Sequence, residues 1–364
     1  MNQEFPRNKE EAVRKLAEED YHVQPNQDFD IYRMEPGDAW GVARCFYEVY
    51  GGHYPFDHYY IPEQLLAADH SGDMIGVVAR TTTGDIIGFG SLFRNFAHNP
   101  RLYETGQATV IPAYRNTLAV MCIQDFIFDT LAPTVDVDLI FGEPVCNHLV
   151  MQKIASLSGF ADTGIELGVM PGETYHKGDG SGGRVSTVLA FKLLYDRPCT
   201  IHLPVEYEAI LRAIIARIPL ARQVAVSAPP APQGVSSTME ARYFDEAQVL
   251  RLSLVALGSD FEARLDDVKE EARARGICVF QVFVNLGDPR AGQAVTLLRK
   301  QGFFFGGFLP QWFGTDGLLM QKLSDLPAFS SVKLLSEESR KLLDVIRDDI
   351  ESSSGPGITS PLPP

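Results

Sequence analysis

The stretch from Thr109 to Val120, TVIPAYRNTLAV, contains residues whose order suits anion binding. A predicted strand stops at Pro112, a tight turn follows, and a helix is expected from Asn116 onward. The first backbone N–H groups of a helix have no acceptor within it, so they are free to donate to a phosphate. The sequence therefore predicts a phosphate-binding turn, and the alternative is an ordinary connection between a strand and a helix.

Two other stretches invite a chemical interpretation that their spacing does not support. His53 and His58 lie five residues apart in GGHYPFDHYY (51–60), which is not the i, i+4 pair of a helical metal site, and no cysteine is near. The glycine-rich HKGDGSGGR (176–184) lacks the GK[ST] of a nucleotide loop and is expected to be a hairpin tip. We predict no metal site.

The overall composition excludes several classes of protein. The 364 residues carry a formal charge of −15, which argues against a general nucleic-acid or anionic-membrane binder. No apolar run has the length needed to span a bilayer, and the first residues have no signal-peptide core. The five cysteines are scattered and odd in number, which is typical of neither a disulfide framework nor a zinc site: Cys45, Cys122, Cys146, Cys199 and Cys278. We expect a cytoplasmic protein.

The order of expected elements indicates an α/β (α+β) protein. An amphipathic helix is expected before residue 28, and residues 29–195 read as β-α-α-β-β-β-α-β-α-β-β. Residues 200–325 repeat the later half of that order in shorter form. In both copies a helix ends in a Gly-Phe step, at Gly159 and at Gly302, and a pair of strands follows.

This order, together with VIPAYRNTLAV after a strand and Asn147 soon after the next strand, resembles the GNAT superfamily of acyl-CoA-dependent N-acyltransferases. The resemblance implies a mixed central sheet flanked by helices, with a second, partial lobe of the same kind. It divides the chain into four segments: a helical extension (1–28), a GNAT-like acyl-CoA lobe (29–198), a degenerate GNAT-like lobe (199–328), and a C-terminal helix with a disordered tail (329–364). In the second lobe, acidic side chains occupy the place of the phosphate turn: Asp260, Glu262, Asp266 and Asp267. That copy is not expected to bind coenzyme A, because these charges would repel its diphosphate.

The resemblance implies that acetyl-CoA, or another acyl-CoA, binds in the first lobe as a co-substrate. The backbone and side chains expected to contact it belong to Val110, Ile111, Pro112, Arg115, Asn116, Thr117, Leu118, Ala119 and Val120, and Asn147 is expected to bond the pantetheine arm. The sequence departs from the family pattern at Leu118 and Val120, where small residues are usual. If these residues have helical dihedral angles, their β-carbons strain nothing and the amides stay directed at the anion, but a leucine side chain can crowd the diphosphate.

Acyl transfer to an amine also needs a base and an acid. The resemblance places the base near the start of the strand that ends in Pro112, where Glu104 stands. Strict alternation along a strand would put Glu104 on one face with Gly106, Ala108 and Val110; the alternative is a solvated carboxylate at the strand entrance. The helix that often supplies a tyrosine as the acid, HLVMQKIASLSGF, contains none. The aromatic residues of 50–60 are expected either to line the acceptor site or to pack on the sheet.

These observations predict transfer of an acyl group, most simply acetyl, from coenzyme A to an amine on a small molecule or peptide. A GNAT-like binding or regulatory module without turnover is the alternative, since both glycine positions are filled and no acid is visible. The acceptor and the oligomeric state do not follow from the sequence.

Overall fold

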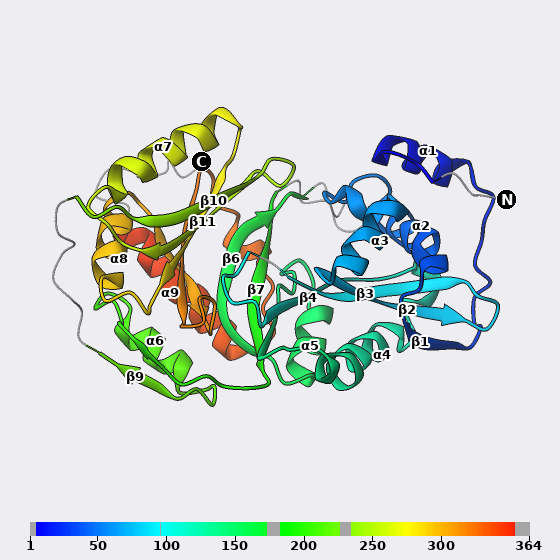
Figure 1. Ribbon diagram of the computed structural model, residues 1–364, viewed down its shortest axis with the longest axis horizontal. Helices are drawn as coiled ribbons and strands as arrows, with labels where there is room; N and C mark the ends of the chain where they lie inside the picture. Colours follow the sequence, from blue (N-terminus) through cyan, green and yellow to red (C-terminus); the bar gives the residue numbers. More distant parts are fainter. Residues whose placement is uncertain (1–4, 95, 173–182, 226–233, 354–364) are drawn as a thin grey trace, which may run out of the picture. The chain divides into compact units, whose positions relative to one another are not determined.

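The computed structural model describes residues 5–94, 96–172, 183–225 and 234–353 (Figure 1). The chain divides into two compact units. The first comprises Met1–Asn95, Tyr103–Ile140 and Gly172–Gly182, and the second comprises Phe96–Leu102, Phe141–Pro171 and Gly183–Pro364. Most of the glycine-rich stretch 176–184, part of the Pro/Ser-rich stretch 227–237 and nearly all of the terminal tail lie outside the described residues.

The first unit is an antiparallel sheet with helices on its faces. Its elements are α1 (Lys9–Glu18), β1 (Phe29–Arg33), α2 (Ala39–Tyr50), α3 (Pro62–Ser71), β2 (Met74–Thr81), β3 (Ile86–Arg94), β4 (Leu102–Val110) and α4 (Ala119–Asp125). The strands β1, β2, β3 and β4 pair antiparallel in that order. Phe46 of α2 packs against Phe89 of β3, whereas Gln124 of α4 accepts a hydrogen bond from Thr105 on β4.

The second unit contains a mixed sheet. Its elements are α5 (Val150–Leu157), β6 (Ala161–Met170), β7 (Val185–Leu193), β8 (Cys199–Ile201), α6 (Glu208–Ile215), β9 (Arg222–Val224), β10 (Thr238–Phe244), β11 (Val249–Ala256), α7 (Phe261–Ala274), β12 (Val279–Asn285), α8 (Ala291–Lys300), β13 (Phe304–Leu309), β14 (Gly317–Leu323) and α9 (Glu337–Ser353). The strand order is β7-β6-β13-β14-β12-β11-β10. Only β11 and β12 run parallel in this order; the other neighbours are antiparallel.

The predicted fold class and the predicted order of elements are confirmed. With β5 (Leu139–Gly142) included, residues 29–193 follow β-α-α-β-β-β-α-β-α-β-β. One boundary differs: the helix expected from Asn116 begins at Ala119, because residues 112–114 form a 3₁₀ turn first. The sheet is mixed and flanked by helices, as predicted.

Two parts of the second unit repeat one another in detail. The helices α5 and α8 both end at a glycine with φ of +80°, Gly159 and Gly302, a backbone conformation that favours glycine. In each case a lysine from the second following strand donates to the carbonyl before the glycine, Lys192 to Ser158 and Lys322 to Gln301, both at 2.6 Å. The strands that follow, β6 and β13, meet at their own glycines, Gly164 and Gly307.

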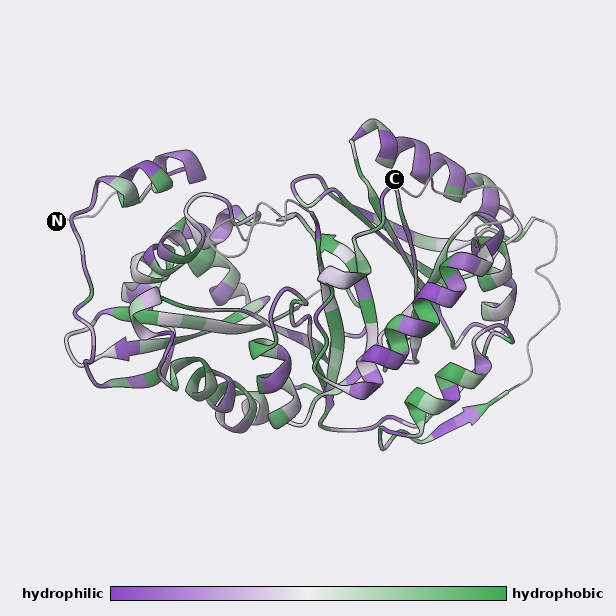
Figure 2. Cartoon of the chain, turned by 180° about the vertical axis from the view of Figure 1, so that it is seen from behind, coloured by the Kyte–Doolittle hydropathy of each residue, from purple (hydrophilic) through white to green (hydrophobic). Residues whose placement is uncertain are grey.

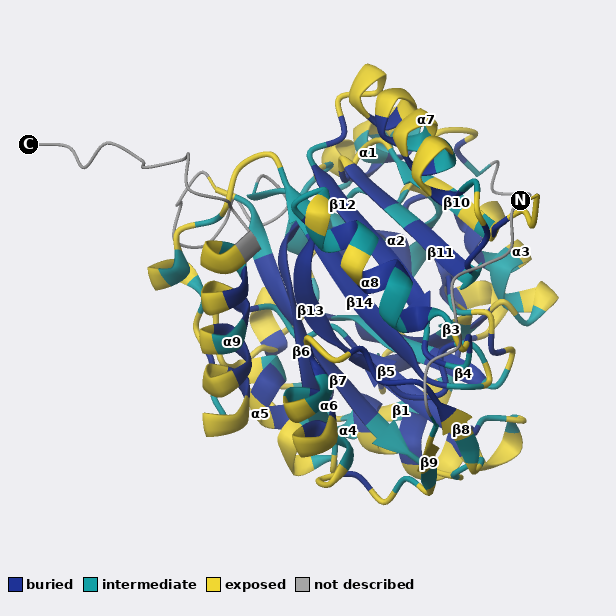
Figure 3. Cartoon of the chain, turned by 90° about the vertical axis from the view of Figure 1, so that its left-hand side faces the viewer, coloured by how far each residue is buried: buried dark blue, intermediate teal, exposed yellow. Residues whose placement is uncertain are grey.

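The core of the second unit lies between its sheet and its helices. In α9, Leu342, Leu343 and Ile346 are buried, and the helix packs against β6 and β13. Figure 2 shows apolar and polar residues alternating along α9, and Figure 3 shows its exposed face turned outward while the strands beside it are buried. This amphipathic pattern is the physical reason that the C-terminal segment folds as a helix on the sheet.

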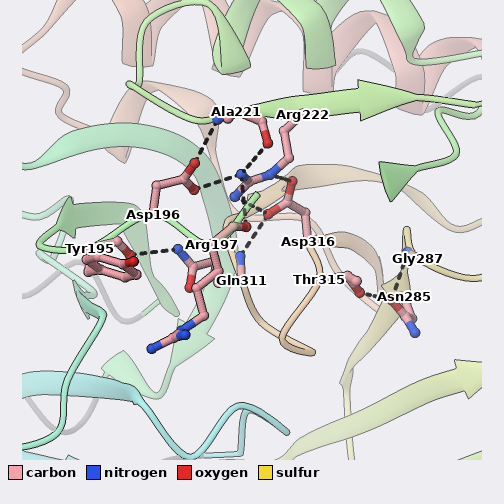
Figure 4. Close-up of polar contacts among 10 residues, drawn as sticks. All are labelled: Tyr195, Asp196, Arg197, Ala221, Arg222, Asn285, Gly287, Gln311, Thr315 and Asp316. Carbon is pink, nitrogen blue, oxygen red and sulfur yellow. Dashed lines mark hydrogen bonds and ion pairs between the residues drawn. The ribbon is translucent and has the colours of Figure 1, made fainter. Parts of the chain in front are cut away.

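A buried arginine joins the β8–β9 ribbon to the start of β14 (Figure 4). Arg222 makes two bonds to the carboxylate of Asp316, at 2.6 and 3.0 Å, and a third to Asp196 at 2.7 Å. The side chain of Arg222 is 1% exposed and that of Asp316 is fully buried. Gln311 also donates its backbone N–H to Asp316 at 2.9 Å, so the carboxylate is held by three separate donors.

We expect Asp316→Asn to lower the free energy of unfolding by about 3–5 kcal/mol, because it leaves the buried Arg222 without its bidentate partner. Urea denaturation followed by circular dichroism measures the change. Asp344→Asn removes an exposed carboxylate 4.0 Å from Arg347 and should cost less than about 1 kcal/mol. Equal losses of unfolding free energy in the two variants would show that the buried ion pair stabilises the fold no more than an exposed one.

Candidate functional site

A bulge in β4 decides which side chains face α2. Glu104 pairs with Phe93, Gly106 pairs with Ser91, and the register then shifts so that Thr109 pairs with Phe89. The shift coincides with Gln107, whose φ is +52°. Two residues of β4 therefore oppose one residue of β3.

This bulge corrects the predicted alternation. Glu104 and Gly106 share a face as expected, but after the register shift that face carries Thr109, and Val110 turns to the opposite face with its partner Gly88. Since Phe89 packs on Phe46 of α2, this is the face beneath α2. The structure thus brings Glu104 and Thr109 to the same side of the sheet, a result that strict alternation could not give.

The aromatic stretch 50–60 packs on that same face. Tyr59 is 2% exposed and stacks on Phe46, with ring centroids 4.4 Å apart. Burial raises the pKa of Tyr59 well above its usual range, and the nearby charge of Glu104 adds to the increase. Most tyrosines of this stretch are buried and pack on the sheet, so they do not form an open lining of an acceptor site. Glu104 lies near one of these buried tyrosines, Tyr59.

Tyr50, at the end of α2, is near both Thr109 of β4 and Arg115 of the turn that follows it. Burial raises its pKa, while the Thr109 hydroxyl and the Arg115 guanidinium oppose that increase. The sequence predicts for Tyr50 either an aromatic lining or packing on the sheet, and no proximity to Thr109. Its position beside Thr109 depends on the bulge, and no sequence signal marked the bulge because glutamine rarely adopts a positive φ.

The turn after β4 has the predicted outline but fewer available amides than expected. Ile111 is buried, Pro112 and Arg115 are exposed, and the backbone N–H of Thr117 already donates to Tyr114 O at 3.1 Å. The Thr117 hydroxyl accepts from the N–H of Ala119 at 3.2 Å. Two of the five amides proposed for anion binding are therefore engaged within the turn.

The amides of Asn116, Leu118 and Val120 have no acceptor among the described residues. Leu118 has φ of −83° and ψ of 6°, which are not the helical angles on which the prediction depended. Its φ is nevertheless negative, so the backbone does not require glycine at this position. Its side chain is 65% exposed. Leu118 therefore does not fill the turn by packing into the core, and the turn keeps unengaged donors.

Asn147 lies in the second unit, between β5 and α5, and is described with that unit. Its Oδ1 atom is buried and has no hydrogen-bond partner among the described residues. A buried carbonyl oxygen without a donor is costly, so this atom is suited to receive a hydrogen bond from a ligand or a water molecule.

Within the described parts of the chain, no group of three or more His, Cys, Asp or Glu side chains is arranged to hold a metal ion. His53 and His58 accordingly form no such group there. All five cysteines are unpaired. Among the helices of the described residues, none combines the length and apolar character needed to cross a bilayer.

No protein-family model and no curated protein matches the chain. Solved structures resemble about half of it. A ribosomal-protein-alanine N-acetyltransferase from Brucella melitensis is 14% identical, with 45% of this chain and 99% of that chain covered and a TM-score of 0.38.

Two further structures give similar values. A GNAT-family acetyltransferase from Streptococcus pneumoniae is 13% identical over 46% of this chain and 100% of its own, with a TM-score of 0.38. A GNAT-superfamily phosphinothricin acetyltransferase from Sinorhizobium meliloti, in complex with AcCoA, is 14% identical over 46% and 89%, with a TM-score of 0.36. At these values the likenesses establish neither family nor activity for this chain.

His58, in the aromatic stretch, makes stability depend on pH. Burial lowers its pKa from 6.5 to about 4, with Asp57 opposing the change. The unfolded chain therefore binds a proton at higher pH than the folded chain does, and the free energy of unfolding should fall as pH drops from about 6.5 to about 4. We expect His58→Gln to reduce this fall by on the order of 1–3 kcal/mol.

Denaturant unfolding at intervals of pH between 4 and 7 measures the difference, with His70→Gln, at an exposed histidine on α3, as the control. A pH dependence that is identical in wild type and His58→Gln would contradict the assignment.

Proposed function

We propose that the protein is an acyl-CoA-dependent N-acyltransferase, most simply an acetyltransferase, acting on an amine of a small molecule or peptide. The observation that carries the proposal is the turn after β4. It presents the unengaged amides of Asn116, Leu118 and Val120 beside the exposed Arg115. Backbone donors with an adjacent guanidinium suit the diphosphate of coenzyme A.

Under this proposal fewer residues donate hydrogen bonds to the coenzyme than the sequence predicts. The donors are the amides of Asn116, Leu118 and Val120 and the side chain of Arg115, while Thr117 and Ala119 shape the turn. Val110, Ile111 and Pro112 bring the chain to the turn at the end of β4. Asn147 belongs to the second unit, and its bond to the pantetheine arm stays a prediction.

Glu104 is the proposed base. In the reaction the amine nitrogen attacks the thioester carbonyl, the C–N bond forms as the C–S bond breaks, and one of the two protons that the nitrogen loses overall passes through water to the leaving thiolate. Glu104 accepts the proton that the ammonium must lose. Two observations support this role for Glu104. Its side chain lies on the face of the sheet that α2 covers, and its charge contributes to the raised pKa of the buried Tyr59. A carboxylate beside buried aromatic rings is partly desolvated, as a general base is expected to be.

The second unit is proposed to contain a degenerate copy of the same lobe. The repeated glycine ends of α5 and α8 and their lysine contacts support a duplication. In the second copy the turn after β11 is filled by its own chain: a β-carbon on Gly258 would lie 2.3 Å from the backbone of Ser237. The N–H groups of Leu257, Gly258 and Ser259 donate to Asp288, Ser237 and Val235. These three amides are therefore not available to a diphosphate.

A binding module without turnover is the second candidate. It is favoured by the absence of a tyrosine from α5 and by the large side chains at Leu118 and Val120. The amine acceptor, the acyl chain and a cytoplasmic location remain proposals. The net charge of −15 favours attraction of a cationic amine over attraction of an acidic one.

Arg115→Glu should abolish the binding of acetyl-CoA, because it places a like charge against the diphosphate. Isothermal titration calorimetry on the full chain measures this, with the same charge change at the exposed Arg273 as the control. The wild type should bind one acetyl-CoA per chain. Unaltered affinity in Arg115→Glu would remove the turn from the site.

Glu104→Gln should lower turnover by about 10²- to 10⁴-fold and leave acetyl-CoA affinity nearly unchanged, because a base acts on proton transfer and not on diphosphate binding. The loss should shrink at high pH, where the free amine needs no base. Thiol release with a panel of amines is the assay, and Glu63→Gln, at an exposed glutamate, is the control.

Equal turnover in Glu104→Gln and wild type at neutral pH would make Glu104 structural. A wild type that binds acetyl-CoA but releases thiol with no amine would support the module without turnover.

A further inference from the structure

Residues 7–28, which we call the N-terminal strap, touch both the aromatic stretch 50–60 and the turn after β4. The strap consists of α1 and the extended chain that leads to β1, and Figure 1 shows it in dark blue within the first unit. The resemblance to an acyltransferase lobe begins only at residue 29, so the proposed reaction assigns the strap no role. Its contacts fall into three groups.

The first group joins α1 to the aromatic stretch. Lys9 donates to the backbone carbonyl of Tyr54 at 2.7 Å, lies 3.2 Å from a carboxylate oxygen of Asp57, and sits 5.3 Å from the ring centre of Tyr60. Ala12 and Leu16 are buried, so α1 is packed and does not project into solvent. One cationic side chain thus contacts three residues of the stretch that packs beside Glu104.

The second group fixes the middle of the strap to α2 and to the β2–β3 turn. Glu19 accepts from Trp40 at 2.6 Å and from Arg44 at 2.9 Å. The Arg44 guanidinium lies 3.7 Å from the ring centre of Tyr21, and the Tyr21 hydroxyl bonds to Asp85. These contacts are directional and pair acidic groups with basic and aromatic ones, so they hold the strap in one position on the first unit.

The third group ends at the proposed coenzyme turn. Tyr114 is 1% exposed, and its hydroxyl donates to Gln24 O at 2.8 Å and accepts from the N–H of Gln27 at 3.1 Å. The backbone carbonyl of Tyr114 accepts from both the N–H and the hydroxyl of Thr117. Tyr114 therefore links the strap to the segment that orients the amides of residues 116–120.

We propose that the N-terminal strap is a positioning element that holds the aromatic stretch through Lys9 and the coenzyme turn through Tyr114, and that acyl-CoA binding and strap docking reinforce one another. Lys9 and Tyr114 are positioning residues, since neither is placed against the reacting atoms. The proposal rests on the proposed acyltransferase function for its ligand. By linkage, a strap that favours the binding-competent turn must itself be held more firmly when the ligand is bound.

Tyr114→Phe tests this directly, because it keeps the ring and removes both hydrogen bonds to the strap. Amide hydrogen exchange on the full chain without ligand should become at least about threefold faster in residues 19–28 and 115–120, measured at the bonded amides of Gln27, Thr117 and Ala119, since bonded amides open more often when their anchor is lost. Tyr32→Phe, at an exposed tyrosine of β1, is the matched control and should leave these segments unchanged.

With acetyl-CoA, the dissociation constant should rise about 10-fold in Tyr114→Phe, and acetyl-CoA should slow exchange of residues 19–28 in wild type. Lys9→Met should speed exchange in residues 50–60 while leaving 115–120 as in wild type. A general loss of stability would speed exchange in all of these segments in both variants, whereas the proposal predicts a different segment for each variant.

Exchange in both segments that is unaffected by Tyr114→Phe would overturn the proposal, and so would ligand-bound wild type with no slowing of residues 19–28. If wild type binds no acetyl-CoA, the proposed function and the reinforcement by ligand both fail. The exchange of the ligand-free variants then decides separately whether the strap holds the two segments.

Discussion

The candidate site depends on one irregularity, the bulge in β4. A regular strand would send Glu104 and Thr109 to opposite faces, because they are five residues apart. The extra residue near Gln107 returns Thr109 to the face that carries Glu104. The carboxylate, the buried tyrosines and the start of the turn consequently lie on one side of the sheet. The chain accepts a glutamine at positive φ to achieve this, a conformation that costs on the order of 1 kcal/mol or more.

The turn after the bulge shows how a binding loop can form without glycine. Glycine is needed where φ is positive or where a ligand must come very close. Leu118 has a negative φ and an exposed side chain, so the backbone itself makes no demand for glycine. The remaining demand is space for a diphosphate, and an exposed leucine can rotate away from an anion more easily than a buried one. The engaged amides of Thr117 and Ala119 are a greater restriction than the leucine.

The order of the elements and the fold class could be predicted from the sequence, because alternating apolar residues, the end at Pro112 and the Gly-Phe steps are local signals. The site could be predicted only in part. The turn is predicted from its order along the chain and Glu104 from the family resemblance, and their roles stay predictions. The bulge depends on pairing between β3 and β4, and the engaged amides depend on the Thr117 side chain. The contacts of the strap with Tyr114 join residues about ninety positions apart, and no local pattern reveals such a contact.

The central claim is that the turn after β4 binds an acyl-CoA through its unengaged amides. Backbone amide resonances of the full chain, followed by NMR during titration with acetyl-CoA, test it most directly. The account predicts saturable shifts at Asn116, Leu118 and Val120 that exceed those at Thr117 and Ala119, with the turn around Gly258 unchanged. Saturable shifts around Gly258, or none in residues 112–120 at millimolar acetyl-CoA, would contradict it.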